Sequence, residues 1–170
     1  MSVVSRRSLV TGLLFAPAII SSPASASTRV AAPVQMTSGS IIVINRQRKL
    51  YFALGDGSAL SYNVAVGRLG KQWLGTRTIV GKFVRPAWSP PAEIRRDNPR
   101  LPAVIPSGSP SNPMGERAMT LSDSEYAIHG TNQPGSIGRF ASYGCVRMHN
   151  HDVIDLYDRV WIGAAVTMLP

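Results

Sequence analysis

Three apolar runs decide the fold class, and they follow one another closely: IIVIN at residues 41–45, KLYFAL at 49–54 and LSYNVAV at 60–66. Runs of this length that are rich in Ile, Val, Tyr and Phe are typical of β-strands. A short polar turn between the first two runs predicts a hairpin, and GDG at residues 55–57 marks the next turn. The folded part of the chain is therefore expected to begin with consecutive paired strands.

Further strands are predicted at residues 79–84, 126–128 and 165–169, and one helix precedes the last of them. The helix is expected to run from His151 to about Val160, with Asn150 as its N-cap and Gly163 as its C-terminal glycine. Its apolar residues recur at helical spacing on one face: Val153, Leu156, Tyr157 and Val160. The sequence therefore predicts a mostly β fold, a sandwich or small barrel, with one clear C-terminal helix.

Residues 85–113 differ in composition from the rest of the chain. They hold more than half of its 13 prolines, among Ser, Asn and Arg, and show little periodicity. A loop of this length inside a compact domain is usually functional or disordered. We interpret this Pro-rich loop as a cover over a substrate cleft, and a plain surface excursion is the alternative.

Residues 1–26 have the pattern of a secretory signal peptide. Arg6 and Arg7 precede an apolar stretch from Leu9 to Ile20, and ASA at residues 24–26 provides a cleavage site. The apolar stretch is too short for a transmembrane helix, so a retained anchor is the weaker alternative. The twin arginines also resemble a Tat signal, which leaves Tat and Sec export both open.

The remaining chain divides into two parts by composition. Residues 27–40 are small, polar and Pro-containing and are expected to form a flexible tether, whereas residues 41–170 are expected to form one folded domain. The formal net charge of +9 favours anionic partners and indicates nothing about the fold. Its arginines are scattered and no basic run is interleaved with aromatic residues, so we expect no nucleic-acid partner.

Cys145 is the only cysteine of the chain, so in an exported protein it has no internal disulfide partner. Gly144 immediately before it permits a tight turn that presents the sulfur together with backbone N–H groups, an arrangement that suits a nucleophile. A thiol with an ordinary pKa of about 8.5 gains from a neighbouring base. Cys145 is therefore predicted to be a nucleophile, and a buried structural cysteine is the alternative.

His129 is the predicted base among the three histidines. It ends the apolar run at 126–128 and precedes Gly130, and functional side chains often occupy such strand ends. His149 and His151 flank the start of the helix and are interpreted as polar cap residues. The spacing C-x3-H-x-H matches no common zinc pattern, so we expect neither a metal nor a cofactor.

Several motifs together resemble the signature of the L,D-transpeptidase catalytic (YkuD-type) domain family. They are HGTN at residues 129–132, SIG at 136–138 and SYGCVRM at 142–148, followed by Asn150 and Asp152. Upstream motifs extend the resemblance over roughly residues 41–169: VG at 66–67, TIVG at 78–81, WSPP at 88–91 and NPMG at 112–115. Two positions depart from the family pattern, because Tyr143 stands where many members carry His, and TIVG replaces a Thr-Pro-x-Gly element.

The resemblance implies a β-sandwich or small barrel of the L,D-transpeptidase type and an exported enzyme of cell-wall biogenesis in the periplasm or cell envelope. It implies that Cys145 attacks the amide that joins the third residue of a peptidoglycan stem peptide to its terminal D-alanine, with His129 as the base. The oxyanion would be held by backbone N–H groups around Tyr143, Gly144 and Cys145.

Three further residues belong to the substrate side of the expected site. Arg147 is expected to bind a stem-peptide carboxylate. Ser142 and Asn150 are grouped with it, although we expect them to shape the loop by hydrogen bonds more than to touch substrate.

The fate of the acyl group is left open by the sequence. The acceptor would be a second stem peptide, which gives a 3→3 crosslink, a lysine of an outer-membrane lipoprotein, or water, as in an L,D-carboxypeptidase. A non-catalytic wall-binding protein is the last alternative, and the intact Cys145–His129 pair argues against it. We expect no stable membrane span once the leader is removed.

Overall fold

The computed structural model describes residues 27–123 and 125–170, so the predicted leader at residues 1–26 lies outside the described part of the chain. The strands are β1 (Thr28–Ala31), β2 (Ile41–Ile44), β3 (Lys49–Ala53), β4 (Ser58–Gly67), β5 (Gly75–Val84), β6 (Arg117–Leu121), β7 (Ala127–His129), β8 (Phe140–Ser142), β9 (Val146–Met148) and β10 (Ala165–Leu169). The helices are α1 (Ala92–Asp97) and α2 (Asn150–Arg159), and 3-10 turns occupy Asn45–Gln47 and Pro134–Ser136. No helix in these described residues is long and apolar enough to span a membrane.

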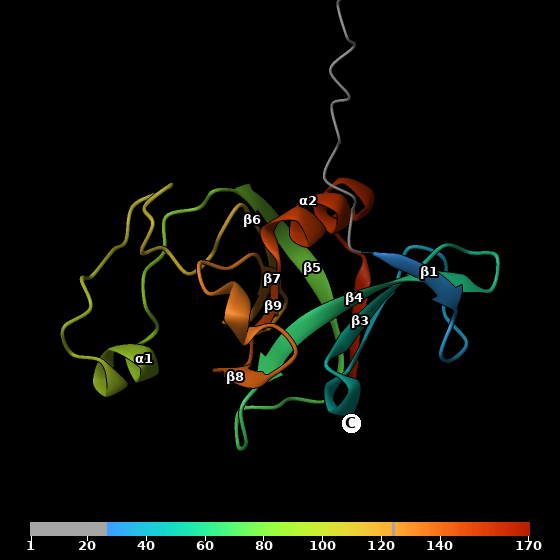
Figure 1. Ribbon diagram of the computed structural model, residues 1–170, viewed down its shortest axis with the longest axis horizontal. Coiled ribbons are helices and arrows are strands. Elements are labelled where there is room, and N and C mark those ends of the chain that lie inside the picture. The colour runs from blue at the N-terminus through green and yellow to red at the C-terminus, as the bar shows by residue number, and fades with distance from the viewer. Residues whose placement is uncertain (1–26, 124) are drawn as a thin grey trace, which may run out of the picture.

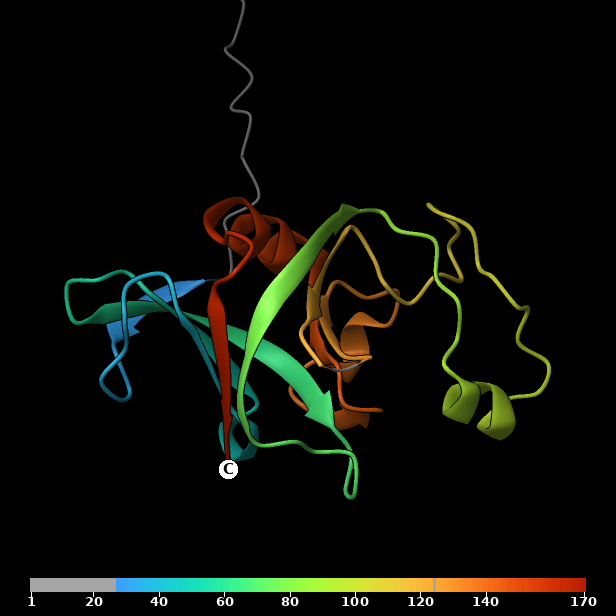
Figure 2. The same cartoon turned by 180° about the vertical axis from the view of Figure 1, so that it is seen from behind.

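Eight of these strands form a closed barrel (Figures 1 and 2). Their order is β4-β3-β2-β10-β5-β6-β7-β9, and β9 pairs back with β4 to close the ring. Within the ring, β2–β10 and β7–β9 are parallel and the other pairs are antiparallel. The long strand β4 also pairs with β1 and, at its C-terminal end, with β8. The prediction of a mostly β fold of the sandwich or small-barrel type is confirmed, and the form is a barrel.

The helix α2 packs its apolar stripe into the main hydrophobic core. Val153 and Leu156 are fully buried there, Val160 is nearly so, and Tyr157 is partly buried against the same cluster. The predicted stripe is therefore confirmed. The predicted bounds agree with α2 to within one residue at each end. The predicted caps are wrong, because Asn150 is the first helical residue and the C-cap is Val160, so that Gly163, with a positive φ of 96°, serves the turn into β10.

Residues 27–40 are not a flexible tether along their whole length, and that expectation is wrong for β1. Thr28–Ala31 pairs antiparallel with β4. Val30, Ala32 and Met36 then pack on a second apolar cluster formed by Ile42, Ile44, Tyr51 and Ala59. The physical reason is that all four residues of β2 are buried, so both faces of the strand need a cover.

Replacement of Leu156 by Ala is expected to lower the free energy of unfolding by roughly 2–5 kcal/mol, because it leaves a cavity in the main core. The matched control is Ile162→Ala, since Ile162 is 62% exposed and its loss should change the stability by no more than about 0.5 kcal/mol. Urea unfolding followed by circular dichroism measures both. Similar shifts for the two variants would contradict the assignment of α2 to the core.

Candidate active site

One cavity of about 390 Å³ contains both Cys145 and His129. Its other wall is the Pro-rich loop at residues 85–113, which carries α1 and projects from one side of the barrel (Figure 1). Loop residues that line the cavity are Trp88, Pro91, Glu93, Ile94, Asn98, Leu101, Ile105, Ser111 and Pro113. We call this loop the cover from here on.

Strand pairing brings the predicted catalytic side chains together. In the parallel pair of β7 and β9, His129 lies opposite Arg147, and Cys145 directly precedes β9. Side chains alternate between the two faces of a strand, so Cys145 and Arg147 face the same side as His129. All three line the cavity.

The turn before Cys145 requires glycine at position 144. Gly144 has a φ of 123°, in the region that L side chains rarely adopt, and a Cβ there would lie 2.3 Å from the ring of Tyr126. The Oγ of Ser142 accepts from the N–H of Gly144 (3.1 Å) and donates to the carbonyl of Cys145 (2.6 Å). From below, the indole N–H of Trp73 donates to the carbonyl of Gly144 at 3.0 Å. These bonds hold the nucleophile loop, residues 142–145, in one conformation.

The hydrogen bonds of this loop distinguish among the three predicted oxyanion donors. The N–H of Gly144 is already used by Ser142, so it is not free to bind an oxyanion. The N–H groups of Tyr143 and Cys145 donate to no acceptor within residues 27–123 and 125–170. Two of the three predicted donors therefore remain available to a ligand.

His129 is held as a neutral imidazole. Its ring is 4% exposed, and Nδ1 lies 2.7 Å from the carbonyl of Gly130. A carbonyl can only accept, so Nδ1 carries the proton and Nε2 is the basic nitrogen. Burial, and to a smaller extent the nearby Arg147, lower the pKa of His129 to about 4, against the opposing effect of the carbonyls of Gly130 and Pro113.

Cys145 rests as a neutral thiol. Its side chain is partly exposed at the cavity, yet its dense surroundings raise the pKa of the thiol. The backbone N–H of Ala127 and the charge of Arg147 oppose this effect. Arg147 is itself largely buried, and its Nε has no hydrogen-bond partner in the described residues. The site therefore pairs a neutral acid and a neutral base beside an unpaired cation.

Asn150 lies behind His129 and outside the lining of the cavity. Its Oδ1 accepts from the N–H groups of Glu116 (3.2 Å) and Thr131 (3.1 Å), and its Nδ2 donates to the carbonyl of Thr131. A Cβ on Gly130 would lie 2.2 Å from this oxygen, which explains the glycine after His129. Ser142 lines the cavity and bonds its own loop, whereas Asn150 bonds the loops beside the cavity. Both arrangements are consistent with a loop-shaping role, and contact of either residue with substrate stays a prediction.

Sequence reasoning missed several residues that build the site. Trp73 stacks on Tyr126, with ring centroids 6.1 Å apart, and the two support the turn at Gly144. Asn112 is buried in the cover and donates to the carbonyls of Pro86 (2.9 Å) and Pro106 (3.0 Å). The motif NPMG at residues 112–115 could have identified Asn112 as a site residue. Nothing in the sequence linked Trp73 to the turn at Gly144, 71 positions away.

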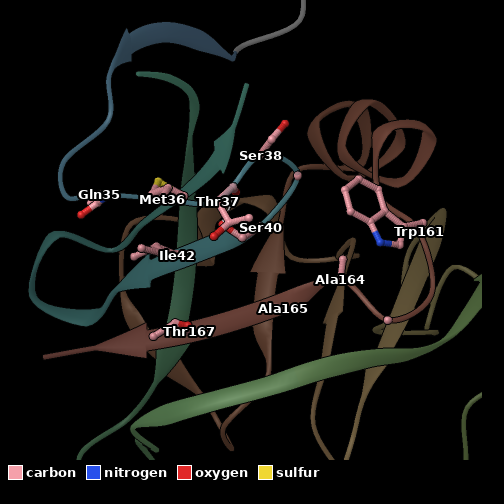
Figure 3. Close-up of a pocket in the computed structure, with 12 residues that line it drawn as sticks. Gln35, Met36, Thr37, Ser38, Ser40, Ile42, Trp161, Ala164, Ala165 and Thr167 are labelled. Atoms are coloured by element: carbon pink, nitrogen blue, oxygen red, sulfur yellow. Dashed lines mark hydrogen bonds between the residues drawn. The ribbon is translucent and has the colours of Figure 1, made fainter. Parts of the chain in front are cut away.

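Two other candidate sites in the described residues lack the side chains for metal binding or nucleophilic catalysis. His149 and His151 stack on each other with centroids 5.3 Å apart, and no group of three metal-ligating side chains occurs in the described residues. A second hollow of about 330 Å³ lies between residues 35–42 and the turn before β10, with Trp161 at one end (Figure 3). Its lining contains no acid, base, histidine or cysteine, so it cannot supply a nucleophile and its base.

Comparison with known proteins agrees with this geometry. The model of the L,D-transpeptidase catalytic domain (YkuD) matches residues 39–168. The probable L,D-transpeptidase YbiS of Escherichia coli (strain K12) is 38% identical over 138 residues, which are 75% of this chain and 44% of that protein. The putative L,D-transpeptidase YqjB of Bacillus subtilis (strain 168) is 33% identical over 74% of this chain and 68% of its own length. The chain thus spans less than half the length of its Escherichia coli relative.

Solved structures share the fold at low identity. An L,D-transpeptidase from Mycobacterium smegmatis aligns with a TM-score of 0.59 and 16% identity, over 76% of this chain and 58% of that one. The Ldtfm–avibactam carbamoyl enzyme aligns with a TM-score of 0.63 and 14% identity, over 79% of this chain and 50% of that one. The family model covers most of this chain, including the strands and the loop that carry Cys145 and His129. The chain therefore belongs to the L,D-transpeptidase catalytic-domain family.

Proposed function

We propose that this protein is a peptidoglycan L,D-transpeptidase that uses Cys145 as a nucleophile. The observation that carries the proposal is the convergence of Cys145, His129 and Arg147 on one cavity from the paired strands β7 and β9. A thiol beside a neutral imidazole is a nucleophile–base pair. Two free backbone N–H groups in the same loop supply oxyanion donors.

In the proposed reaction, the substrate is a stem peptide that ends in D-alanine. His129 Nε2 takes the proton of Cys145 as the sulfur attacks the carbonyl of the amide before that D-alanine. The N–H groups of Tyr143 and Cys145 bind the oxyanion. The imidazolium then protonates the leaving amine of D-alanine, and a thioester remains on the sulfur.

The neutral resting states of His129 and Cys145 are consistent with proton transfer during the attack on the carbonyl. Both His129 and Cys145 are neutral before substrate binds, because burial opposes the charged form of each. The proton transfer is then coupled to attack on the carbonyl, where the oxyanion donors offset the new charge. Arg147 is proposed to bind a carboxylate of the stem peptide, since its guanidinium is unpaired and lines the cavity.

The second half-reaction transfers the acyl group to an amine. The proposed acceptor is a second stem peptide, which gives a 3→3 crosslink, or a lysine of an outer-membrane lipoprotein. We place the reaction in the periplasm, with residues 1–26 as a cleavable Tat or Sec signal peptide. The formal charge of +9 is consistent with work beside an anionic wall.

Residues 27–170 incubated with a purified disaccharide-tetrapeptide should release D-alanine and form a crosslinked dimer, both measured by mass spectrometry. Cys145→Ala should abolish both products while circular dichroism stays unchanged, because it removes the nucleophile and little volume. Turnover by the alanine variant would refute the nucleophile. A tripeptide without dimer would point to the L,D-carboxypeptidase activity.

A β-lactam should acylate Cys145. One solved relative is in complex with imipenem and another is with a faropenem-derived adduct. Attack on the carbonyl of a β-lactam opens the ring, and the leaving nitrogen stays attached to the acyl group. Imipenem should therefore raise the intact mass of this protein by the mass of one imipenem. Cys145→Ala is the matched control and should keep its mass. An adduct that persists in this variant would place the modification elsewhere.

Burial of neutral His129 should make the protein less stable in mild acid. The folded pKa of about 4 lies below the ordinary value of 6.5, so the unfolded chain binds the proton more readily and stability falls as pH drops below 6.5. Between pH 7.5 and pH 5 this residue should cost about 2 kcal/mol of unfolding free energy. Urea titrations of wild type and His129→Gln measure the difference, and equal pH slopes would contradict a buried neutral imidazole.

A further inference from the structure

The cover is attached firmly at its base. Its entry and exit are joined by Arg85 and Glu116, with Nε–Oε2 and Nη2–Oε1 distances of 2.7 and 3.0 Å. Trp88 and Ile105 form a two-way backbone bridge, and Asn112 holds the adjoining carbonyls from inside. Asn132, beside the catalytic strand β7, donates to the carbonyl of Pro110 at 3.1 Å.

The tip of the cover, α1, has a different kind of attachment. No residue of α1 is buried, so apolar packing does not fix it. It is held through Asp97, whose Oδ2 accepts from the hydroxyl of Tyr143 at 2.6 Å and from Nη2 of Arg68 at 3.2 Å. Glu93 at the other end of α1 pairs with Lys71.

These contacts join α1 to the nucleophile loop and not merely to the barrel. Tyr143 lies two residues before Cys145 and carries one of the two free N–H groups. The guanidinium of Arg68 stacks on the Tyr143 ring at 3.9 Å, and the backbone N–H of Arg68 donates to the carbonyl of Ser142 at 2.9 Å. These contacts link the cover, the turn at residue 68 and the nucleophile loop into one hydrogen-bonded cluster.

We propose that Tyr143, Asp97 and Arg68 form a clasp that holds α1 against the nucleophile loop, and that Tyr143 is the positioning residue that couples the two. The inference rests on the proposed function for its chemical consequence. With the clasp closed, water is kept from the thioester on Cys145 while the acceptor amine displaces the sulfur to give an amide and free thiol. With the clasp open, water displaces the sulfur instead and gives a carboxylic acid and free thiol.

The clasp depends on tyrosine, and not histidine, at position 143. Many members of the family carry histidine there, whereas the longer phenol of Tyr143 reaches Asp97 and leaves a flat ring for Arg68. The side chains of Arg68 and Asp97 are 44% and 38% exposed and Tyr143 is half-buried, and ion pairs this exposed stabilise little. The clasp is therefore expected to open and close readily and to act on the cover without supporting the fold.

The test compares Tyr143→Phe and Asp97→Asn with wild type. Tyr143→Phe keeps the ring that Arg68 stacks on and removes the hydroxyl donor, and Asp97→Asn removes the charge. The matched control is Asp56→Asn, which removes an exposed aspartate that pairs with Arg29 at the β1–β4 end of the barrel. Hydrogen exchange of the α1 amides of Arg95 and Asn98, bonded to Pro91 and Ile94, is the first readout.

Exchange at these amides, and the rate of Cys145 alkylation by iodoacetamide, should each rise about two- to fivefold in the clasp variants and stay unchanged in Asp56→Asn. The ratio of hydrolysed tripeptide to crosslinked dimer should rise by a similar factor. Unchanged exchange in both clasp variants would overturn the clasp, whether or not the protein turns over substrate. Raised exchange with an unchanged product ratio would overturn the role in excluding water.

Discussion

The pairing of β9 with two neighbours is the constraint on which the rest of the structure depends. This strand has three residues, and it pairs with β7 on one side and β4 on the other. The β4 pairing closes the barrel, and the β7 pairing sets Cys145 beside the strand that ends in His129. One short strand thus completes the hydrogen bonding of the fold and fixes the geometry of the site.

The parts of this arrangement that depend on local chemistry could be predicted from the sequence. The apolar runs at β2, β3 and β4 identified consecutive strands, and the glycine before a lone cysteine identified a presented thiol. Even the covering of β2 by the N-terminal segment had a signal, since four consecutive apolar residues leave no face for solvent. The strands β8 and β9 had weaker signals, because each has only three residues. The five-residue strand β6 was also not predicted, and it is paired on both sides by β5 and β7.

The remaining differences come from hydrogen-bond partners that residue type and spacing do not identify. Asparagine is a common N-cap residue. The side-chain amide of Asn150 instead forms hydrogen bonds with the backbone of Glu116 and Thr131, and not with its own helix. Gly144 offered an N–H donor by position, and only the three-dimensional turn reveals that Ser142 Oγ uses it. A single sequence gives residue types and spacing, whereas these assignments depend on which groups are already satisfied.

The place of β10 in the barrel has a consequence for the order in which the chain folds. β10 lies between β2 and β5, although it comes last of the strands along the chain. Until residues 165–169 pair, β2 and β5 each keep an unpaired edge at the centre of the sheet. Contacts between residues so distant in sequence also form slowly, so the chain stays open and vulnerable to aggregation until β10 pairs with β2 and β5.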